Sequence, residues 1–250
     1  MSETPLLKKL QRQFVAGSIG LLPIVPMLLV QGQITRWKVG LLPDAEGPMH
    51  GSAGDGSAKE SLLVLGESTV AGLGARDHEH ALAGRFAHYL SQKLDKQIDW
   101  QVVGKNGVTA RRTIDELVPL VPKTAFDHVL LGLGGNDVMK LSSPKKWRSD
   151  MRELIGIVRK YSPDSIIYMS NCPMIVMSPI MPEPIKSILW RLSQMHDANA
   201  KEFSLEFERI HYFPQPVDVP LEGFFADGLH PSEQGYDDWS RAMVDHFIKY

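Results

Sequence analysis

The sequence has little cysteine, no large excess of charge and no internal repeat. Its 250 residues include a single cysteine, Cys172, so an intrachain disulfide and a cysteine-based zinc site are both excluded. The formal net charge is -2, from 27 basic and 29 acidic residues. This balance gives no electrostatic reason to expect binding to a phosphate backbone. We therefore expect no nucleic-acid partner, and no metal ion or other cofactor.

The remaining composition is that of an ordinary globular protein. Hydrophobic residues make up 43% of the chain and charged residues 22%, with 21 glycines and 17 prolines. A chain of this length and composition can bury a full core. Disorder and fibrous repeats are therefore excluded as descriptions of the whole chain.

A long apolar run lies near the N-terminus. No residue from Gln13 to Thr35 is charged, and the stretch 14–30 is almost wholly apolar. At about 1.5 Å per residue, such a helix crosses most of a hydrocarbon layer about 30 Å thick. The end of the run, VQGQITRW, lacks the A-x-A pattern of a cleaved signal peptide. We predict a retained transmembrane helix in an anchor segment, residues 1–42.

The orientation and geometry of this segment have alternatives. The basic flanks are Lys8, Lys9 and Arg12 before the run and Arg36 and Lys38 after it. This small bias predicts an inner-membrane protein whose catalytic domain is periplasmic. Pro23 and Pro26 interrupt the run and keep open a second interpretation. In it, one or two short helices pack on the domain or lie in the bilayer surface.

The rest of the chain predicts a linker and one folded domain. Residues 43–60 are rich in Gly, Ser, Pro and Ala without apolar periodicity, which indicates a flexible linker. From 61 to 250, short apolar runs alternate with longer amphipathic ones. This pattern predicts an α/β fold, a three-layer flavodoxin-like sandwich with a five-stranded parallel sheet, preceded by the N-terminal apolar helix. We expect strands at 61–66, 99–104, 127–134, 165–170 and 209–214, and helices at 80–94, 111–118, 144–161, 184–207 and 232–249.

Three short motifs follow the first three expected strands, where ligands bind in such folds. Ser68 stands in GES, a place for a nucleophile or simply a turn serine. Gly107 stands in an Asn-Gly pair. A glycine there can bring a backbone N–H close to a ligand, and the alternative is that the pair only forms a turn. Asn136 in GLGGND offers an amide donor for an oxyanion, or caps the next helix.

A fourth motif, DGLHPS, precedes the last expected helix. Asp227 and His230 are three residues apart in it. At that spacing a carboxylate can hold the imidazole in one tautomer, so that its other nitrogen faces a serine. The motif therefore completes the residue types needed for nucleophilic catalysis.

These four motifs, in this order, resemble the four blocks of the SGNH/GDSL hydrolase superfamily, and ESTVAGLGA resembles a bacterial, esterase-like or lysophospholipase-like branch of it. The resemblance covers about 61–250. It implies Ser68 as nucleophile, His230 as general base and then acid, and Asp227 as the carboxylate that orients it. It also implies an oxyanion hole made by the N–H groups of Ser68 and Gly107 and the side chain of Asn136. Glu67 departs from the family pattern, which usually has Asp there, and we expect an altered turn rather than lost activity.

The loop after the fourth expected strand suggests a substrate class. It carries four prolines between 173 and 184 and is rich in Met and Ile. We expect Met174, Met177 and Ile180 to line a wall for an acyl chain, because Met adapts to varied shapes. Each could instead cover the core.

The sequence therefore predicts a membrane-anchored serine esterase that hydrolyses carboxylic esters or thioesters through an acyl-enzyme. The expected substrates are lipid-like acyl esters. One alternative is a carbohydrate O-acetyl esterase. The other is a catalytically silent protein that binds acylated ligands or serves as a scaffold.

Overall fold

A computed structural model describes residues 3–40, 42–216 and 222–248 of the chain. Six strands form one sheet in the order β1-β3-β2-β4-β5-β6. The strands are β1 (His50–Ala53), β2 (Lys59–Gly66), β3 (Gln97–Gly104), β4 (His128–Gly132), β5 (Ile166–Met169) and β6 (Ile210–Tyr212). Strands β2 to β6 are parallel, in the flavodoxin-like order that the sequence predicts, and β1 adds an antiparallel edge.

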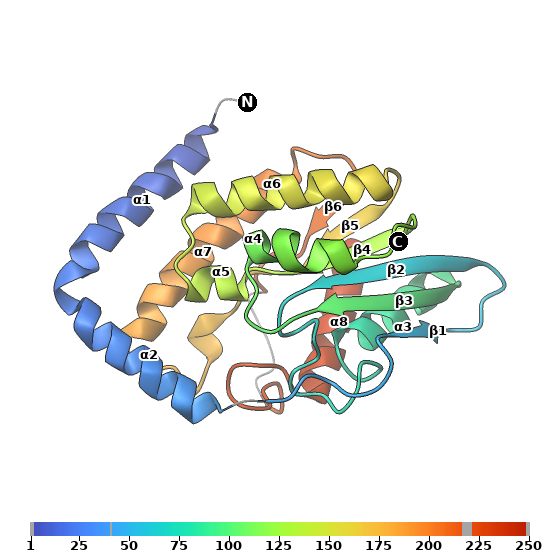
Figure 1. Ribbon diagram of the computed structural model, residues 1–250, viewed down its shortest axis with the longest axis horizontal. Helices are drawn as coiled ribbons and strands as arrows, with labels where there is room; N and C mark the ends of the chain where they lie inside the picture. Colours follow the sequence, from blue (N-terminus) through green and yellow to red (C-terminus); the bar gives the residue numbers. More distant parts are fainter. Residues whose placement is uncertain (1–2, 41, 217–221, 249–250) are drawn as a thin grey trace.

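Helices cover both faces of this sheet (Figure 1). One face packs against α3 (Leu82–Leu94) and α8 (Glu233–Phe247). The other packs against α6 (Pro144–Tyr161), α7 (Ile185–Ser204) and a short helical stretch. That stretch is α4 (Ala110–Arg112), the π-helix η2 (Thr113–Leu117) and the 3₁₀ helix η3 (Val118–Leu120). The three-layer prediction is therefore confirmed.

The alternation of side chains along β2 produces the two cores. Leu62 and Val64 point to the α3/α8 face, whereas Leu63 and Leu65 point to the α6/α7 face. Successive strand residues point to opposite faces, so a run of apolar residues fits a strand that is buried on both sides. This is why the short apolar run at the predicted first strand forms the centre of the sheet.

Capping residues define where α6 and α8 begin. Ser143 caps α6 by accepting a hydrogen bond from the backbone N–H of Lys146 (3.3 Å), with Pro144 at the first helical position. Ser232 caps α8 in the same way through the N–H of Gly235 (3.1 Å). Because Ser232 follows His230 so closely, the start of α8 fixes the position of the DGLH loop.

The segment 43–60, expected as a flexible linker, contains β1. This strand pairs antiparallel with β3, with Gly51 opposite Trp100. The sequence HGSA has no apolar periodicity, and an edge strand needs little, because backbone hydrogen bonds to one neighbour hold it. The sheet also begins before position 61, since β2 starts at Lys59.

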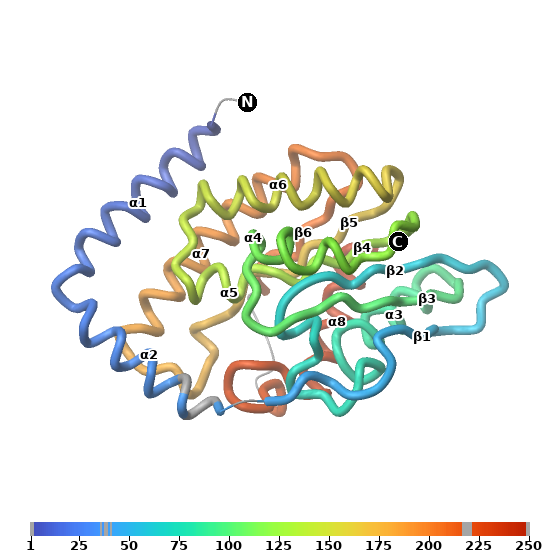
Figure 2. Tube along the Cα trace, in the orientation of Figure 1, coloured from blue at the N-terminus to red at the C-terminus, as the bar shows by residue number. Residues whose placement is uncertain are grey.

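The N-terminal apolar segment is a bent pair of helices and not one straight helix. Helix α1 (Pro5–Leu21) and helix α2 (Val25–Val39) are joined by the 3₁₀ turn η1 (Leu22–Ile24). Figures 1 and 2 show this N-terminal arm (residues 5–39) along the outer side of α7. Pro23 and Pro26 lie at the bend, where they remove backbone N–H donors. Residues 5–35 are long and apolar enough to cross a membrane. A signal sequence meets the same criterion of length and composition.

Candidate active site

Ser68 lies in a tight turn just beyond the end of β2. The turn is closed by hydrogen bonds from the N–H groups of Val70 and Ala71 to the carbonyl of Glu67 (both 2.9 Å). Ser68 is 8% exposed. Its own carbonyl accepts from the N–H of Leu73 (3.1 Å), which continues the turn away from the sheet. The serine therefore stands at the carboxyl edge of the parallel sheet, where the sequence predicts it.

Three glycines at the ends of three neighbouring strands make room for this turn. Gly66 is in register with Gly104 on one side and with Gly132 on the other. A Cβ atom on Gly132 would lie 2.6 Å from Cγ2 of Val70, and one on Gly104 would lie 2.6 Å from the N of Ala71. Any side chain there would push the Ser68 turn off the strand ends. The three apolar-then-Gly strand ends are a sequence signal for this site that the predictions above do not use.

Glu67 connects the Ser68 turn to Asn136. Helix α5 (Gly135–Met139) starts directly after β4, and Glu67 binds its first turn. The carboxylate accepts from the N–H of Gly135 (2.7 Å) and the N–H of Asn136 (2.7 Å). It also accepts from Nδ2 of Asn136 (2.5 Å). Burial raises the pKa of Glu67 to about 7, although these hydrogen bonds act in the opposite direction.

The Gly107 loop is tied to the same helix. Gly107 has φ +80°, and its carbonyl oxygen accepts from Nη1 of Arg112 (3.1 Å) and from Nζ of Lys140 (2.5 Å). Oδ2 of Asp137 accepts from the N–H of Ala110 (2.9 Å). These contacts fix the Gly107 peptide relative to α5. Three of the four predicted blocks are therefore joined by direct hydrogen bonds.

The fourth block holds Asp227 and His230 in contact. Nδ1 of His230 lies 2.8 Å from Oδ2 of Asp227. Oδ1 of Asp227 accepts from the N–H groups of Leu229 (2.9 Å) and His230 (2.7 Å). Burial alone would raise the pKa of Asp227, but the hydrogen bonds from His230 and Leu229 lower it below its ordinary value. The carboxylate is thus kept ionised beside the imidazole.

Two contacts bring the loop of the fourth block against the Ser68 turn. The hydroxyl of Tyr236, in the first turns of α8, donates to the carbonyl of Leu73 (2.7 Å). Gly74, with φ +94°, is so close to Pro231 that a Cβ on it would lie 2.1 Å from the proline carbonyl oxygen. The serine turn and the histidine loop therefore pack directly on each other.

The apolar loop after β5 divides into buried and half-buried residues. It contains the 3₁₀ turn η4 (Ile175–Met177). Ile175 and Met181 are buried in a cluster with α7 and cover the core. Met174, Met177 and Ile180 are only half-buried. Ile180 lies against Gly228, whose carbonyl accepts from Oγ of Ser178 (2.7 Å), so this part of the loop contacts the Asp227–His230 segment.

Two other candidate reactive groups lie outside the four blocks, the Asp77–His80 pair and Cys172. Asp77 and His80 repeat the three-residue spacing and are also in contact (2.7 Å), a pair not among the residues predicted above. About a third of each of these side chains is exposed, and Nε2 of His80 faces the Arg76 guanidinium. Burial raises the pKa of the Cys172 thiol to about 12, so it is not a nucleophile.

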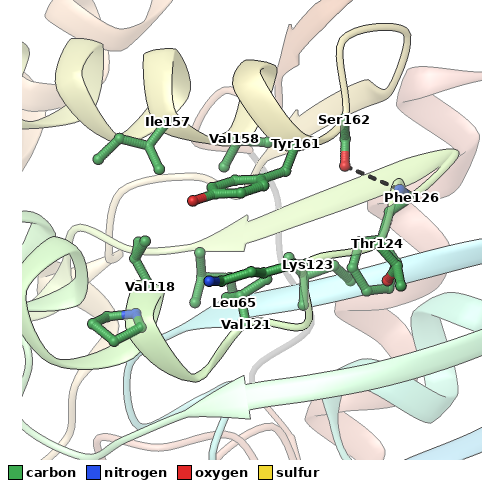
Figure 3. A pocket seen from close by; sticks show the side chains of 12 residues that line it. Leu65, Val118, Val121, Lys123, Thr124, Phe126, Ile157, Val158, Tyr161 and Ser162 are labelled. Atoms are coloured by element: carbon green, nitrogen blue, oxygen red, sulfur yellow. Dashed lines mark hydrogen bonds between the residues drawn. The ribbon is translucent and has the colours of Figure 1, made fainter.

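The pocket in Figure 3 is a separate feature. It has a volume of about 250 Å³ and lies between β2, the η3 turn and the end of α6. Leu65, Val118, Ile157 and Tyr161 are among its lining residues. None of the predicted site residues lines it in the described part of the chain.

Comparison with known proteins places the four blocks within one family match. The sequence profile of the GDSL-like Lipase/Acylhydrolase family matches residues 64–237, which include all four blocks. No curated protein sequence matches the chain.

Solved structures share the fold at low sequence identity. The psychrotrophic esterase EstA from Pseudoalteromonas sp. is 18% identical, with a TM-score of 0.55 over 75% of this chain and 98% of that one. The lipase Lip_vut3 from a goat rumen metagenome is 14% identical, with a TM-score of 0.59 over 73% and 95%. A family two carbohydrate esterase from Clostridium thermocellum, in complex with cellohexaose, is 14% identical, with a TM-score of 0.55 over 83% and 66%.

The profile match spans more than half of the chain, and it covers the serine, glycine and asparagine blocks that follow β2, β3 and β4 and the histidine block before α8, in order. The chain therefore belongs to the GDSL-like lipase/acylhydrolase family and is a carboxylic ester hydrolase.

Proposed function

We propose that the protein hydrolyses esters through a Ser68–His230–Asp227 triad and a covalent acyl-enzyme. The observation that carries this proposal is the Asp227–His230 contact of 2.8 Å in a loop packed against the Ser68 turn. A buried carboxylate at Nδ1 fixes the tautomer in which Nε2 can accept a proton.

In this mechanism Ser68 Oγ attacks the ester carbonyl while His230 takes its proton. The tetrahedral oxyanion would accept hydrogen bonds from the N–H groups of Ser68 and Gly107 and from Nδ2 of Asn136. Because that amide nitrogen carries two protons, one can stay with Glu67 while the other binds the oxyanion. His230 then returns the proton to the leaving alcohol. A water molecule, deprotonated by His230, hydrolyses the acyl-enzyme and restores Ser68.

Hydrolysis of p-nitrophenyl esters by the full chain tests the triad. Ser68→Ala should abolish turnover, and Asn136→Ala should lower kcat by roughly 10²–10³-fold, as for other oxyanion donors. Ser240→Ala is the matched control, because this serine is also buried but lies on α8 away from the strand ends. If the folded parent shows no Ser68-dependent hydrolysis of any ester, natural acyl lipids included, the silent ligand-binding alternative replaces this proposal.

For the substrate we propose lipid-like acyl esters. Met177 and Ile180 are half-buried, and Ile180 lies next to Gly228, which supports an acyl-binding wall beside the loop that carries Asp227 and His230. Met177→Ser with Ile180→Ser should reduce activity on palmitoyl esters far more than on acetyl esters. Val176→Ser, at an exposed position of the same loop, is the control.

A carbohydrate O-acetyl esterase is the second candidate. Its support is the structural likeness to the Clostridium thermocellum carbohydrate esterase. An optimum at acetyl esters, with equal losses on all chain lengths in the double variant, would favour it.

We also propose that the N-terminal segment attaches the enzyme to a membrane. The uncharged run from Gln13 to Thr35 supports attachment. If the segment spans the bilayer, the basic residues before the run support a cytoplasmic N-terminus and a periplasmic catalytic domain. For such a span, a reporter fused to the C-terminus should be active only in the periplasm of a bacterial host, and activity confined to the cytoplasm would reverse the orientation.

A further inference from the structure

We propose that the N-terminal arm does not cross the bilayer but lies in its surface, with the α1–α2 elbow inserted and both ends on the same side. The proposal concerns the form of attachment and does not depend on the triad.

The beginning of α1 is docked on the catalytic domain. Oγ1 of Thr4 caps α1 and donates to Oε2 of Glu202 on α7 (2.6 Å). Nζ of Lys145, at the start of α6, pairs with Glu3 (2.7 Å). One turn further on, Leu7 and Leu10 are buried. The segment before the apolar run is thus held against α6 and α7.

The end of α2 is docked on the same domain. Nε2 of Gln31 donates to the carbonyl of Glu183, just before α7 (2.8 Å). A Cβ atom on Gly32 would lie 3.8 Å from Cδ1 of Ile185, so the two residues are neighbours, and Thr35 is buried. The apolar run therefore leaves the domain after Phe14 and returns to it near Gln31.

A span would have to break one of these docked ends, because it places them on opposite sides of the membrane. The lengths of the two helices also argue against a span. Helix α1 has 17 residues and α2 has 15. At about 1.5 Å per residue each is roughly 22–26 Å long, less than the hydrocarbon thickness of about 30 Å. The docked arm thus has the geometry of two in-plane helices that meet at an elbow.

The outer surface of this elbow is apolar and open. Ile19, Leu22 and Leu29 are 63%, 65% and 69% exposed, and Trp37 at the far end is 82% exposed. Monomeric soluble proteins rarely expose apolar patches of this kind. Interfacial helices bury such a face at the boundary between headgroups and acyl chains, where Trp is favoured.

The charge of the arm selects an anionic lipid surface rather than a second copy of the chain. Residues 1–43 contain five basic residues and one acidic residue, Glu3, which is already paired with Lys145. The exposed Lys8, Lys9 and Arg12 thus find no free acid on a facing arm. Anionic headgroups supply the missing charge.

The N-terminal arm and the loop that carries Asp227 and His230 pack against the same buried apolar cluster. Phe14 of the arm packs against the same buried residues as Leu229, which lies between Asp227 and His230. If the proposed triad is correct, an in-plane arm would therefore hold the active site close to membrane-embedded esters.

Cysteine labelling distinguishes in-plane from spanning arms. Lys8→Cys and Asp44→Cys are placed singly in the full chain at exposed positions on either side of the run. The parent is the unlabelled control, because Cys172 is buried. In sealed vesicles of a bacterial host membrane, an impermeant maleimide should label both variants from one side and neither from the other. Labelling from opposite sides overturns the proposal.

Vesicle binding tests the elbow itself and needs no catalysis. Full chain should co-sediment with vesicles of phosphatidylcholine and phosphatidylglycerol in equal amounts, and less with phosphatidylcholine alone. Leu22→Glu with Leu29→Glu should lower the partition coefficient at least about tenfold. Leu120→Glu, an exposed leucine outside the arm, should leave it unchanged. Unchanged binding of the double variant, or a dimer by light scattering that dissociates in it, overturns the proposal. The labelling result decides the question if the double variant does not fold.

Discussion

Oε2 of Glu67 accepts hydrogen bonds from both the backbone N–H (2.7 Å) and the side-chain amide (2.5 Å) of Asn136. The residue before Ser68, the proposed nucleophile, therefore orients the residue proposed as an oxyanion donor. This connection runs between the ends of two adjacent strands, β2 and β4. The departure from the family pattern at Glu67 thus has a definite structural role, beyond the altered turn expected from the sequence.

Glu67→Ala should lower kcat by about 10²-fold with little change in KM, since a donor displaced by about 1 Å loses transition-state stabilisation. Glu67→Asp should retain much more activity, because a carboxylate remains near α5. Steady-state kinetics on p-nitrophenyl acetate measure both. Glu60→Ala, at the opposite end of the same strand, is the control. A fall in kcat as large in Glu67→Asp as in Glu67→Ala would contradict the positioning role.

The raised pKa of Glu67 predicts a pH-dependent stability. Its folded pKa of about 7 lies above the ordinary value of 4.5, so the folded protein keeps a proton that the unfolded chain releases. The resulting stabilisation is fully present below pH 4.5 and is lost as pH rises through 7. Its size is on the order of 3 kcal/mol.

Urea unfolding at pH 5 and pH 8 checks this prediction by comparing the parent with Glu67→Gln. The comparison is needed because burial lowers the pKa of His78, His196 and His211, and these groups act in the opposite direction. They cancel in the difference between the two proteins. The parent should lose stability relative to Glu67→Gln between pH 5 and pH 8. A constant difference would show that Glu67 does not titrate in this range.

Two glycines with positive φ should respond differently to alanine. A Cβ on Gly74 would lie 2.1 Å from the carbonyl oxygen of Pro231, whereas one on Gly107 meets nothing within 4 Å. Gly107→Ala should cost about 1–2 kcal/mol, from the backbone alone. Gly74→Ala should cost more, and it should also lower kcat because it displaces the loop with His230. Equal unfolding free energies and equal kcat in the two variants would contradict the packing of this loop on the Ser68 turn.

Much of the sheet could be predicted because apolar runs mark buried parallel strands. The run SLLVLG and the four others all form strands within two residues of their expected limits. Strand β1 could not be predicted, since HGSA is held by backbone pairing to β3 and carries no apolar signal. The bend in the arm was visible in Pro23 and Pro26, but its docking depends on Glu183 and Glu202, far along the chain.

The site was predictable by position but not by its connections. Ser68, Asn136 and His230 each follow a strand or precede a helix, so local motifs mark them. The contact of Glu67 with Asn136 joins residues 69 positions apart and depends on strand register. Sequence alone does not reveal such a contact.

Arg148 should be a main determinant of stability on the side of the domain that holds the arm. Its side chain is buried, and it donates to Oδ1 of Asn199 (2.8 Å), Oε2 of Glu202 (2.6 Å) and Oε1 of Glu206 (3.1 Å). Arg148→Ala leaves these acceptors without their cation and should lower the free energy of unfolding by about 3–5 kcal/mol.

Arg241→Ala is the control for this prediction, since Arg241 is exposed and, within the described part of the chain, pairs only with Asp238 on the helix surface. It should change stability by less than about 1 kcal/mol. Urea unfolding measures both variants. Because Glu202 also accepts from Thr4 at the cap of α1, Arg148→Ala should in addition speed tryptic cleavage after Lys8 and Lys9. If cleavage is faster but the domain keeps its stability, Arg148 stabilises the docked arm and not the domain. If stability falls but cleavage is not faster, Thr4 docks the arm independently of Arg148.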